Sequence, residues 1–428
     1  MVLKLNLDKV RGRVALAIAV LAGSALLIIV IASRFVIGTL ADGRLQVTRA
    51  MLQVPVEYFP NSARLNARLA SAELSESDRD LSTAKIHAQR AAALSPYDHR
   101  IRIMLASVEE AGGDRPAAQA SLEAARTLAP NYWSVNYRLG NLLVREGKLA
   151  EALNPFRIAV AGNSTLLPGT LDLLWRASRG DVNALETVTG NDPSARLTLA
   201  QFLLKVSRPV EAAAVFGSID RAGRLALSRE SSTFLNSLIA TGGLGQARDL
   251  WSEMAGGDRQ STLVWNGGFE FDILKDFSQF DWSFGKSDYA RFSIDTSVVH
   301  SGSRSLRIEF VGRDTTRLDN EIKQLVLLRP GARYTLECFA KPGELETPEG
   351  PRVVVTSASS PDWIAASEPI ARGSGDWQRL AFEFVAPQSP NGGVMSAVFV
   401  SIKRKPKFSY DEPTGGTVWL DDFSVKEQ

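Results

Sequence analysis

The residues that most often carry catalysis or bind metals are scarce in this chain of 428 residues. It has one cysteine, Cys338, and three histidines, His87, His99 and His300, which lie far apart in the sequence. One cysteine excludes an internal disulfide and a cysteine-based zinc site, and scattered histidines argue against a Ser–His–Asp triad or a histidine-rich metal centre. The sequence contains no P-loop, HExxH, GxSxG or DxDxDG motif. It therefore predicts a non-catalytic protein.

The charged residues leave one catalytic alternative open and exclude one class of partner. Glycoside hydrolysis needs only a pair of carboxylates, and acidic residues are abundant after residue 262, although none stands out by position. A polysaccharide-acting enzyme is therefore the least favoured alternative. The 49 Lys and Arg nearly balance the 47 Asp and Glu, which leaves a net charge of +2. No overall field attracts nucleic acid, and we expect no nucleic-acid partner.

An uncharged run near the N-terminus is long enough to cross a membrane. Val14 to Ser33 are 20 residues without a charge, and a helix of this length spans about 30 Å, the thickness of the bilayer hydrocarbon. We therefore predict a cytoplasmic N-terminus over residues 1–13 and a transmembrane helix over 14–33. The alternative is a cleaved signal peptide; we favour an anchor because the run exceeds the roughly 7–15 apolar residues usual in such peptides.

Basic residues around this run predict its orientation. Four Lys or Arg residues precede it, and three follow it within the next 16 residues. The positive-inside rule then favours a cytoplasmic N-terminus and an exported body. The expected location is a bacterial inner membrane, crossed once, with the bulk of the chain in the periplasm or outside.

The segment from 45 to 260 is rich in alanine and repeats every 34 residues. Pro96 and Pro130 are one repeat apart. Small residues recur at the same interval in three columns: Ala84, Ala118 and Ala152; Ala91, Ala125 and Ala159; Ala72, Ala106 and Gly140. Small residues let two antiparallel helices approach closely, and each proline ends the second helix of a unit. Because each helix pair leaves an apolar face for the next pair to cover, we predict one helical solenoid over 45–260.

This pattern resembles the tetratricopeptide repeat, a helix–turn–helix unit of 34 residues. The match is best where Gly140, Ala152 and Phe156 occupy the small and aromatic positions of that family. The resemblance implies a concave surface, lined by the first helix of each unit, that holds a peptide or a partner protein. The candidate partner-binding residues on one such helix are Trp133, Asn136, Tyr137 and Asn141. The alternatives are a solenoid that serves only as a spacer and, for Trp133, packing in the core.

After residue 262 the chain becomes rich in aromatic residues and in short alternating runs. Five of the eight tryptophans lie there. Residues 305–310, 334–339, 380–385 and 418–425 alternate between apolar and polar positions, and Gly, Pro and Ser turns separate them. This spacing predicts an antiparallel β-sandwich over 262–428. The expected fold class is therefore multidomain, with a transmembrane helix, an all-α solenoid and an all-β jelly-roll sandwich.

The order of motifs in this sandwich resembles the galactose-binding-like jelly roll of carbohydrate-binding modules. The motifs are NGGFE at 266–270, SGSRSL at 301–306, KP at 341–342 and VWLDDF at 418–423. Members of that family often hold a structural calcium. The resemblance places its ligands at Glu270, Gly302, Ser303 and Asp421, and oxygen ligands suit this hard cation. The alternative is that Glu270 and Asp421 only cap turns.

The same resemblance implies sugar rings stacked on exposed aromatic side chains. Trp363 is the best candidate, followed by Tyr289 and Tyr410, with ordinary loop packing as the alternative for each. The basic run at 403–407 could meet an acidic polysaccharide or lipid, but we expect a solvated loop. The tryptophans at motif positions are expected in the core: Trp265, Trp282, Trp377 and Trp419.

These parts predict a membrane-anchored, non-catalytic scaffold. Its repeats would recruit a protein partner, and its jelly roll would contact a polysaccharide. By analogy with other anchored repeat proteins, we expect a role in bacterial envelope or exopolysaccharide assembly and export. The alternative is a scaffold for proteins only, in which the jelly roll is a structural cap.

Overall fold

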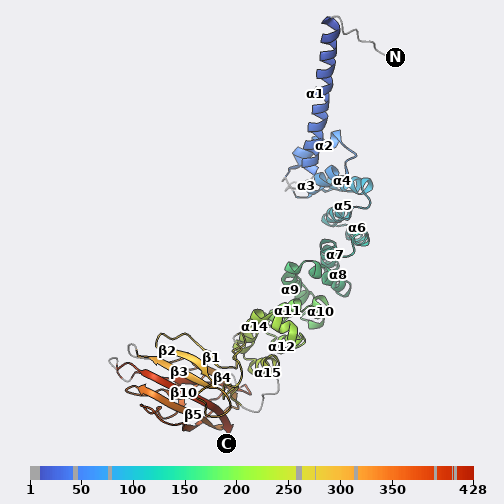
Figure 1. Cartoon of the computed structure of the whole chain (residues 1–428). Helices are drawn as coiled ribbons and strands as arrows, with labels where there is room; N and C mark the ends of the chain where they lie inside the picture. Colours follow the sequence, from blue (N-terminus) through green and yellow to red (C-terminus); the bar gives the residue numbers. More distant parts are fainter. Residues whose placement is uncertain are drawn as a thin grey trace. The chain divides into compact units, whose positions relative to one another are not determined.

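The computed structural model describes residues 10–41, 47–75, 80–256, 263–274, 276–312, 317–389, 393–406, 408 and 412–428. The chain forms two compact units, Met1–Thr189 and Gly190–Gln428. The first unit is helical, and the second has helices followed by two antiparallel β-sheets (Figure 1). The expected order of an apolar helix, a helical repeat region and a β-sandwich is therefore confirmed.

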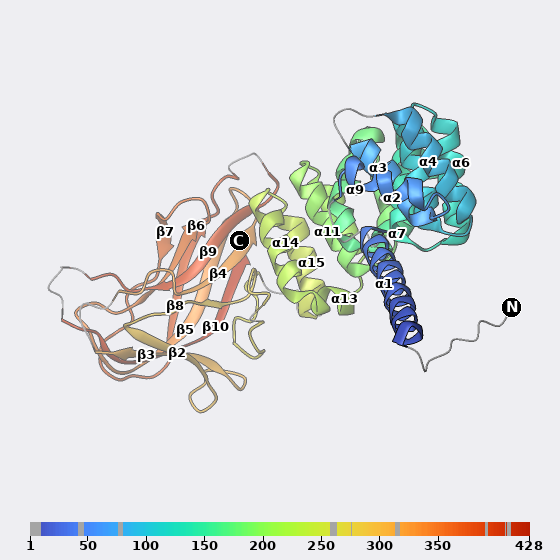
Figure 2. The ribbon, with the colours of Figure 1, turned by 90° about the horizontal axis from the view of Figure 1, so that it is seen from above.

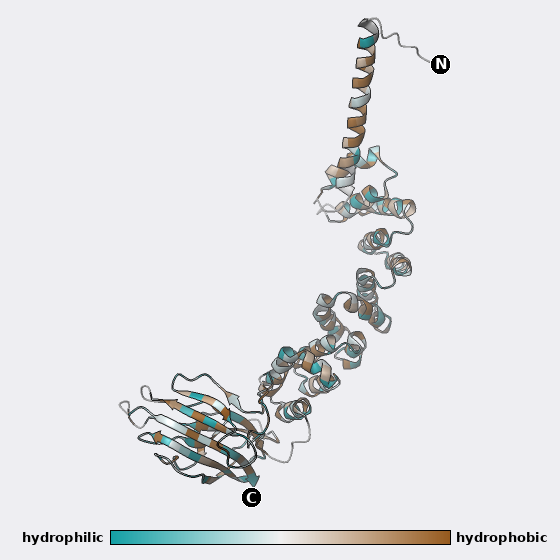
Figure 3. Ribbon diagram, in the orientation of Figure 1, coloured by the Kyte–Doolittle hydropathy of each residue, from teal (hydrophilic) through white to brown (hydrophobic). Residues whose placement is uncertain are grey.

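Helix α1 (Val10–Ala41) contains the apolar run. Within it, the 24 residues Arg13–Val36 are long and apolar enough to cross a membrane, and none of the most apolar stretch is buried in the protein. Figure 3 shows hydrophobic residues along most of this helix. The predicted span 14–33 lies inside it.

The rest of the first unit is built from paired helices. In chain order they are α2 (Arg49–Tyr58), α3 (Ala63–Ser75), α4 (Leu81–Leu94), α5 (His99–Ala111), α6 (Arg115–Leu128), α7 (Trp133–Arg145), α8 (Leu149–Gly162), α9 (Leu167–Ala177) and α10 (Val182–Thr189). Helices α3 and α4, α5 and α6, and α7 and α8 pack as pairs. Figure 1 shows these pairs following one another, and Figure 2 gives the same chain turned by 90°. The short pair α9 and α10 occupies the segment where the 34-residue register is lost.

Small residues allow the close approach inside each pair. Ala84, Ala118 and Ala152 are fully buried at equivalent places in α4, α6 and α8. A Cβ added at Gly140 would lie 2.9 Å from the ring of Phe156, closer than real Cβ contacts come. The helix can therefore carry no side chain at this position.

The prediction is wrong for one residue of the small-residue columns, Ala72, which does not face Ala84. Ala72 packs with Leu52 and Val56 of α2, whereas Ala70 packs with Ala84 in the core between α3 and α4. The reason is the length of the turn. Five residues, 76–80, separate α3 from α4, but only three, 112–114, separate α5 from α6. Counting back 34 residues therefore misses the facing position in α3 by two.

The second unit begins with helices, and the last two of them, α14 and α15, contact the segment that opens the β-sandwich. The helices are α11 (Pro193–Lys205), α12 (Pro209–Gly217), α13 (Arg221–Ala226), α14 (Ser228–Ala240) and α15 (Leu244–Ala255). The buried Trp251 of α15 donates from Nε1 to the carbonyl oxygen of Phe277 at 2.6 Å, and its ring meets Trp265 edge-on at 4.9 Å. Gln279 donates to the backbone and the hydroxyl of Ser232 in α14. The predicted boundary at 260–262 therefore lies inside a compact unit.

The sandwich has two five-stranded antiparallel sheets. The strands are β1 (Ser283–Phe284), β2 (Ala290–Asp295), β3 (Ser305–Val311), β4 (Ile322–Leu328), β5 (Arg333–Glu346), β6 (Arg352–Ser357), β7 (Trp363–Ala366), β8 (Gln378–Val385), β9 (Ser396–Lys403) and β10 (Gly415–Glu427). Sheet A has the order β1-β4-β9-β6-β7, and sheet B has the order β2-β3-β10-β5-β8. The four alternating runs of the sequence form β3, β5, β8 and β10.

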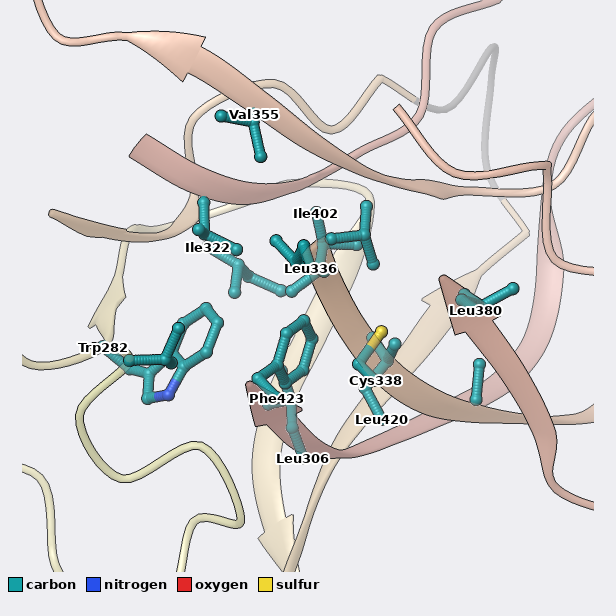
Figure 4. Packing of buried hydrophobic residues seen from close by; sticks show 14 of the residues in the cluster. Trp282, Leu306, Ile322, Leu336, Cys338, Val355, Leu380, Ile402, Leu420 and Phe423 are labelled. Carbon is teal, nitrogen blue, oxygen red and sulfur yellow. The ribbon is translucent and has the colours of Figure 1, made fainter. Parts of the chain in front are cut away.

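The core lies between the two sheets because apolar residues alternate along each strand. Leu306, Leu336, Val400 and Leu420 are fully buried, and Trp282 fills the space beside them. Figure 4 shows Trp282, Phe423 and the aliphatic side chains meeting in one cluster. This packing leaves the outer face of each sheet for polar and functional side chains.

Candidate functional site

A groove between α5 and α7 is the candidate partner-binding site. Trp133, Tyr137 and Asn141 are four residues apart, so they share one face of α7. Together with Glu110 of α5 and Arg145 they line a hollow of about 420 Å³, which Ser134 and Arg138 complete. The structure therefore brings together three of the four residues that we singled out, on the first helix of a pair.

The aromatic rings of this groove are held from behind by α8. Tyr137 meets the buried Phe156 edge-on, with ring centres 6.0 Å apart. A Cβ added at Gly162 would lie 3.0 Å from Cβ of Trp133, so the end of α8 comes very close to that residue. Trp133 and Tyr137 are half-buried. Trp133 both packs against α8 and lines the hollow.

Two arginines add positive charge that sequence reasoning missed. Arg145 pairs with Glu110, and Arg138 donates from Nη1 to the Ser107 hydroxyl at 2.8 Å. Both partners lie on α5, 35 and 31 residues earlier, so the contacts arise only because successive repeats stack. The only signal in the sequence was helical spacing: Arg145 follows Asn141 by four residues, which places both on the same face of α7.

Asn136 is not part of the groove, which corrects our expectation. Its side chain is fully buried, and Nδ2 donates to the carbonyl oxygens of Pro130 at 2.8 Å and Tyr132 at 3.1 Å. The amide thereby ties the turn before α7 to its first turn. Asn66 makes the same pair of bonds to Pro60 and Ser62 before α3. This repetition marks a structural role.

Trp363 lies on the outer face of sheet A, at its edge. It is paired with Thr356 and is 38% exposed. Lys405 Nζ lies 5.0 Å from the centre of its ring, within cation–π range. An exposed ring beside a cation is suited to stacking against a sugar, especially an anionic one.

Of the other two sugar-site candidates, the structure describes only Tyr289, which does not join Trp363. Tyr289 precedes β2, at the edge of sheet B, and its carbonyl oxygen accepts from the N–H of Val311 in β3. Tyr410 lies outside the described residues. The two candidates that the structure describes, Trp363 and Tyr289, therefore lie on different sheets and form no common aromatic site.

We expected the basic run at 403–407 to be a solvated loop, but two of its residues, Lys403 and Arg404, are buried, and Lys407 lies outside the described residues. Lys403 ends β9 and is buried, with Nζ 3.0 Å from Asp319 Oδ1. Although burial raises the pKa of Asp319, the bond from Lys403 holds it below its ordinary value. Arg404 is also buried, and its backbone pairs with Leu318. These two cations belong to the framework, which leaves Lys405 beside Trp363.

Only two of the four motif tryptophans are in the core. Trp265 and Trp282 are buried, as expected. Trp419 lies on the outer face of sheet B, because its neighbours in β10, Val418 and Leu420, take the inward positions. Its Nε1 donates to Asp295 at 2.8 Å. Trp377, beside the first residue of β8, is likewise half-exposed, with its ring 5.5 Å from His300.

Glu270 holds the SGSRSL turn directly. Its Oε1 accepts from the backbone N–H groups of Ser303 at 2.8 Å and Arg304 at 3.2 Å, and Oε2 accepts from the Ser303 hydroxyl. Although burial raises the pKa of Glu270, these bonds lower it overall. A Cβ at Gly302, where φ is +62°, would lie 2.1 Å from Oε1. Glycine is therefore required for this approach.

Asp421 caps the other end of the same turn. It is fully buried, and Oδ2 accepts from the N–H groups of His300 at 2.9 Å and Ser301 at 3.3 Å. Burial raises the pKa of this carboxyl to about 6. The next residue, Asp422, contacts His300 Nδ1 at 2.6 Å.

In this structure the carboxylates of Glu270 and Asp421 make hydrogen bonds to N–H groups. Calcium takes about six to eight oxygen ligands, whereas Glu270 and Asp421 face N–H donors. Among the described residues, no group of three or more His, Cys, Asp or Glu is placed to hold a metal. The hydrogen bonds are those of turn caps, and the calcium stays a prediction.

No family model matches the sequence, and no curated protein matches it. Solved structures are similar to parts of the chain. The CBM22-2 xylan-binding domain of Paenibacillus barcinonensis Xyn10C is 14% identical over 38% of this chain and 98% of its own, with a TM-score of 0.27. MamA is 13% identical over 40% and 94%, with a TM-score of 0.32. The tetratricopeptide repeat protein YrrB is 15% identical over 49% and 93%, with a TM-score of 0.26.

Proposed function

We propose that this chain is a membrane-anchored, non-catalytic scaffold whose repeats hold a protein partner and whose β-sandwich contacts a polysaccharide. The observation that carries the proposal is the groove of the first unit. Trp133, Tyr137 and Asn141 converge there with two arginines, in a hollow between the first helices of successive repeats. Aromatic side chains and arginine are the types enriched where proteins bind one another.

The groove also suggests the chemistry of the bound segment. Its rings offer half-buried apolar surface, and Asn141 adds an amide. Arg145 is 48% exposed although paired with Glu110, so a carboxylate from a partner can approach the guanidinium and compete for it. An extended segment with one apolar and one acidic side chain fits these groups.

The sugar-binding role rests on Trp363. A half-exposed indole on an outer sheet face offers a flat apolar surface for a sugar ring, and Lys405 favours an anionic sugar. The proposed setting is a bacterial inner membrane crossed once by α1, with the part of the chain that follows α1 in the periplasm or outside. The proposed process is envelope or exopolysaccharide assembly and export.

One observation favours the alternative, in which the chain binds proteins only and the sandwich caps the helices. Trp251 and Ser232 of the last helices bond directly to the loop that opens the sandwich, at Phe277 and Gln279. A cap needs this contact, whereas a tethered sugar-binding module does not.

A photo-crosslinking experiment tests the groove. A photoreactive amino acid replaces Tyr137 in the full chain in cells, and the control replaces Arg157, an exposed residue on the second helix α8. We expect one discrete protein adduct from position 137 that is absent at 157 and is lost on Arg145→Glu. Equal labelling at both positions would count against the groove.

A glycan array with the detergent-solubilised full chain tests the sugar role. We expect binding that Trp363→Ala abolishes and Tyr97→Ala leaves intact, since Tyr97 is an exposed aromatic in the turn between α4 and α5. Binding to no glycan, together with a captured protein, would favour the cap.

A further inference from the structure

Helix α2 is apolar on two opposite faces, and the part of the chain that the structure describes buries only one of them. Leu52 and Val56 are buried and pack with Leu65, Leu69 and Ala72 of α3. These contacts fix how α2 is rotated about its axis. The opposite face must therefore point away from the repeats.

That opposite face carries large apolar side chains. Met51, Val54 and Tyr58 are 53%, 56% and 77% exposed, and their spacing of three and four residues puts them on one stripe. Phe59, at the end of the helix, is also exposed. Gln53 and Glu57, which flank the stripe, are exposed and polar. A helix with this division is of the kind that lies in a membrane interface.

The chain keeps α2 close to the end of the apolar helix. Helix α1 ends at Ala41 and α2 begins at Arg49, so seven residues, 42–48, connect them. The eight Cα-to-Cα steps from residue 41 to residue 49, at roughly 3.5 Å each, reach no further than about 28 Å. If α1 crosses the bilayer, the start of α2 must lie within that distance of the end of α1.

We propose that the Met51–Val54–Tyr58 face of α2 lies in the headgroup region of the bilayer, while Leu52 and Val56 seat the first repeat on the same helix. The anchor then has two parts, one that crosses the membrane and one that lies on it. Tyrosine suits this depth because its ring is apolar and its hydroxyl is polar. The inference rests on the proposed anchoring by α1.

Spin labelling of the full chain in nanodiscs of phosphatidylethanolamine and phosphatidylglycerol tests this. The native Cys338 is buried, and burial raises the pKa of its thiol, so it does not compete for the label. Single cysteines replace Val54 on the stripe, Glu57 on its flank, Leu26 in α1 and Arg157 in α8. Collision rates with oxygen, which enters lipid, and with a nickel chelate, which stays in water, are measured at each position.

We expect a high oxygen-to-nickel ratio with Leu26→Cys, a ratio severalfold above the water-exposed value with Val54→Cys, and water-like ratios with Glu57→Cys and Arg157→Cys. A lipid-like Leu26 label with a water-like Val54 label overturns the α2 inference and leaves the anchor standing. A Val54 label shielded from both reagents, or broadened by a second label nearby, shows that another copy covers α2 and also overturns it. A water-like Leu26 label refutes the anchor itself, and the α2 inference with it.

Discussion

The bond between Trp251 and Phe277 offers the most direct test of the compact units. The indole is 2% exposed, and its N–H donates to the Phe277 carbonyl oxygen at 2.6 Å. Its ring also meets Phe280 at 5.7 Å between ring centres. Trp251→Phe keeps an aromatic ring in place but removes the donor, so a buried carbonyl loses its partner.

The size of the effect follows from these contacts. An unsatisfied buried carbonyl costs about 1–3 kcal/mol, and the smaller ring adds a partial cavity, for a total of about 2–4 kcal/mol. The unit Gly190–Gln428 has about 240 residues. For domains of this size each kcal/mol lowers Tm by about 2–4 °C, so we expect a decrease of roughly 4–16 °C.

Scanning calorimetry of the full chain, with near-ultraviolet circular dichroism to follow the aromatic-rich sandwich, measures this change. Because the last helices and the sandwich form one compact unit, the sandwich signal should move with Trp251→Phe. The control is Trp175→Phe in α9, which belongs to the other unit and should leave that signal unchanged. A sandwich transition whose midpoint is unchanged by Trp251→Phe would refute the reasoning and would favour a domain boundary near residue 260.

Three further outcomes are expected. Asp281 is buried, and burial raises the pKa of its carboxyl to about 6. Because the folded state binds the proton more tightly, the unfolding free energy relative to Asp281→Asn should fall by up to about 3 kcal/mol as pH rises from 4 to 6. Urea titrations measure this difference, and a difference that does not change with pH would contradict the prediction. Asn136→Ala should cost about 1–3 kcal/mol of unfolding free energy, whereas Asn141→Ala should mainly reduce crosslinking in the groove; equal stability losses would argue against the distinction. The predicted calcium is tested by calorimetry with and without chelator: the bonds of Glu270 and Asp421 favour an unchanged midpoint, and a lower midpoint on chelation would support the ion.

Several features of the fold were predictable because they depend on local patterns. The small residues at Ala84, Ala118 and Ala152 set the helix pairs, and period-two alternation marked four of the strands. Ala72 was misassigned because a turn two residues longer shifts the facing position, and spacing alone does not reveal turn length. Trp419 was misassigned although the signal was present, since its place between Val418 and Leu420 directs it outward.

The candidate site was predictable only in part, for the same reason. Four-residue spacing placed Trp133, Tyr137 and Asn141 together, because a helix repeats its face over short distances. Asn136 has the same chemistry as Asn141, and only its three-dimensional surroundings show that it is committed to a turn. The place of Arg145 in the groove became clear only from its ion pair with Glu110, which lies one repeat earlier in the chain.

The amino-acid sequence by itself determined the three kinds of element and their order, since apolar run length, the 34-residue repeat and strand alternation are properties of neighbouring residues. Only the tertiary structure decided which side chains share a surface. It joined the last helices to the sandwich through Trp251, turned Glu270 toward the backbone of its turn, and left Met51, Val54 and Tyr58 uncovered. These outcomes depend on contacts between residues distant in sequence, which form only when packed elements bring them together.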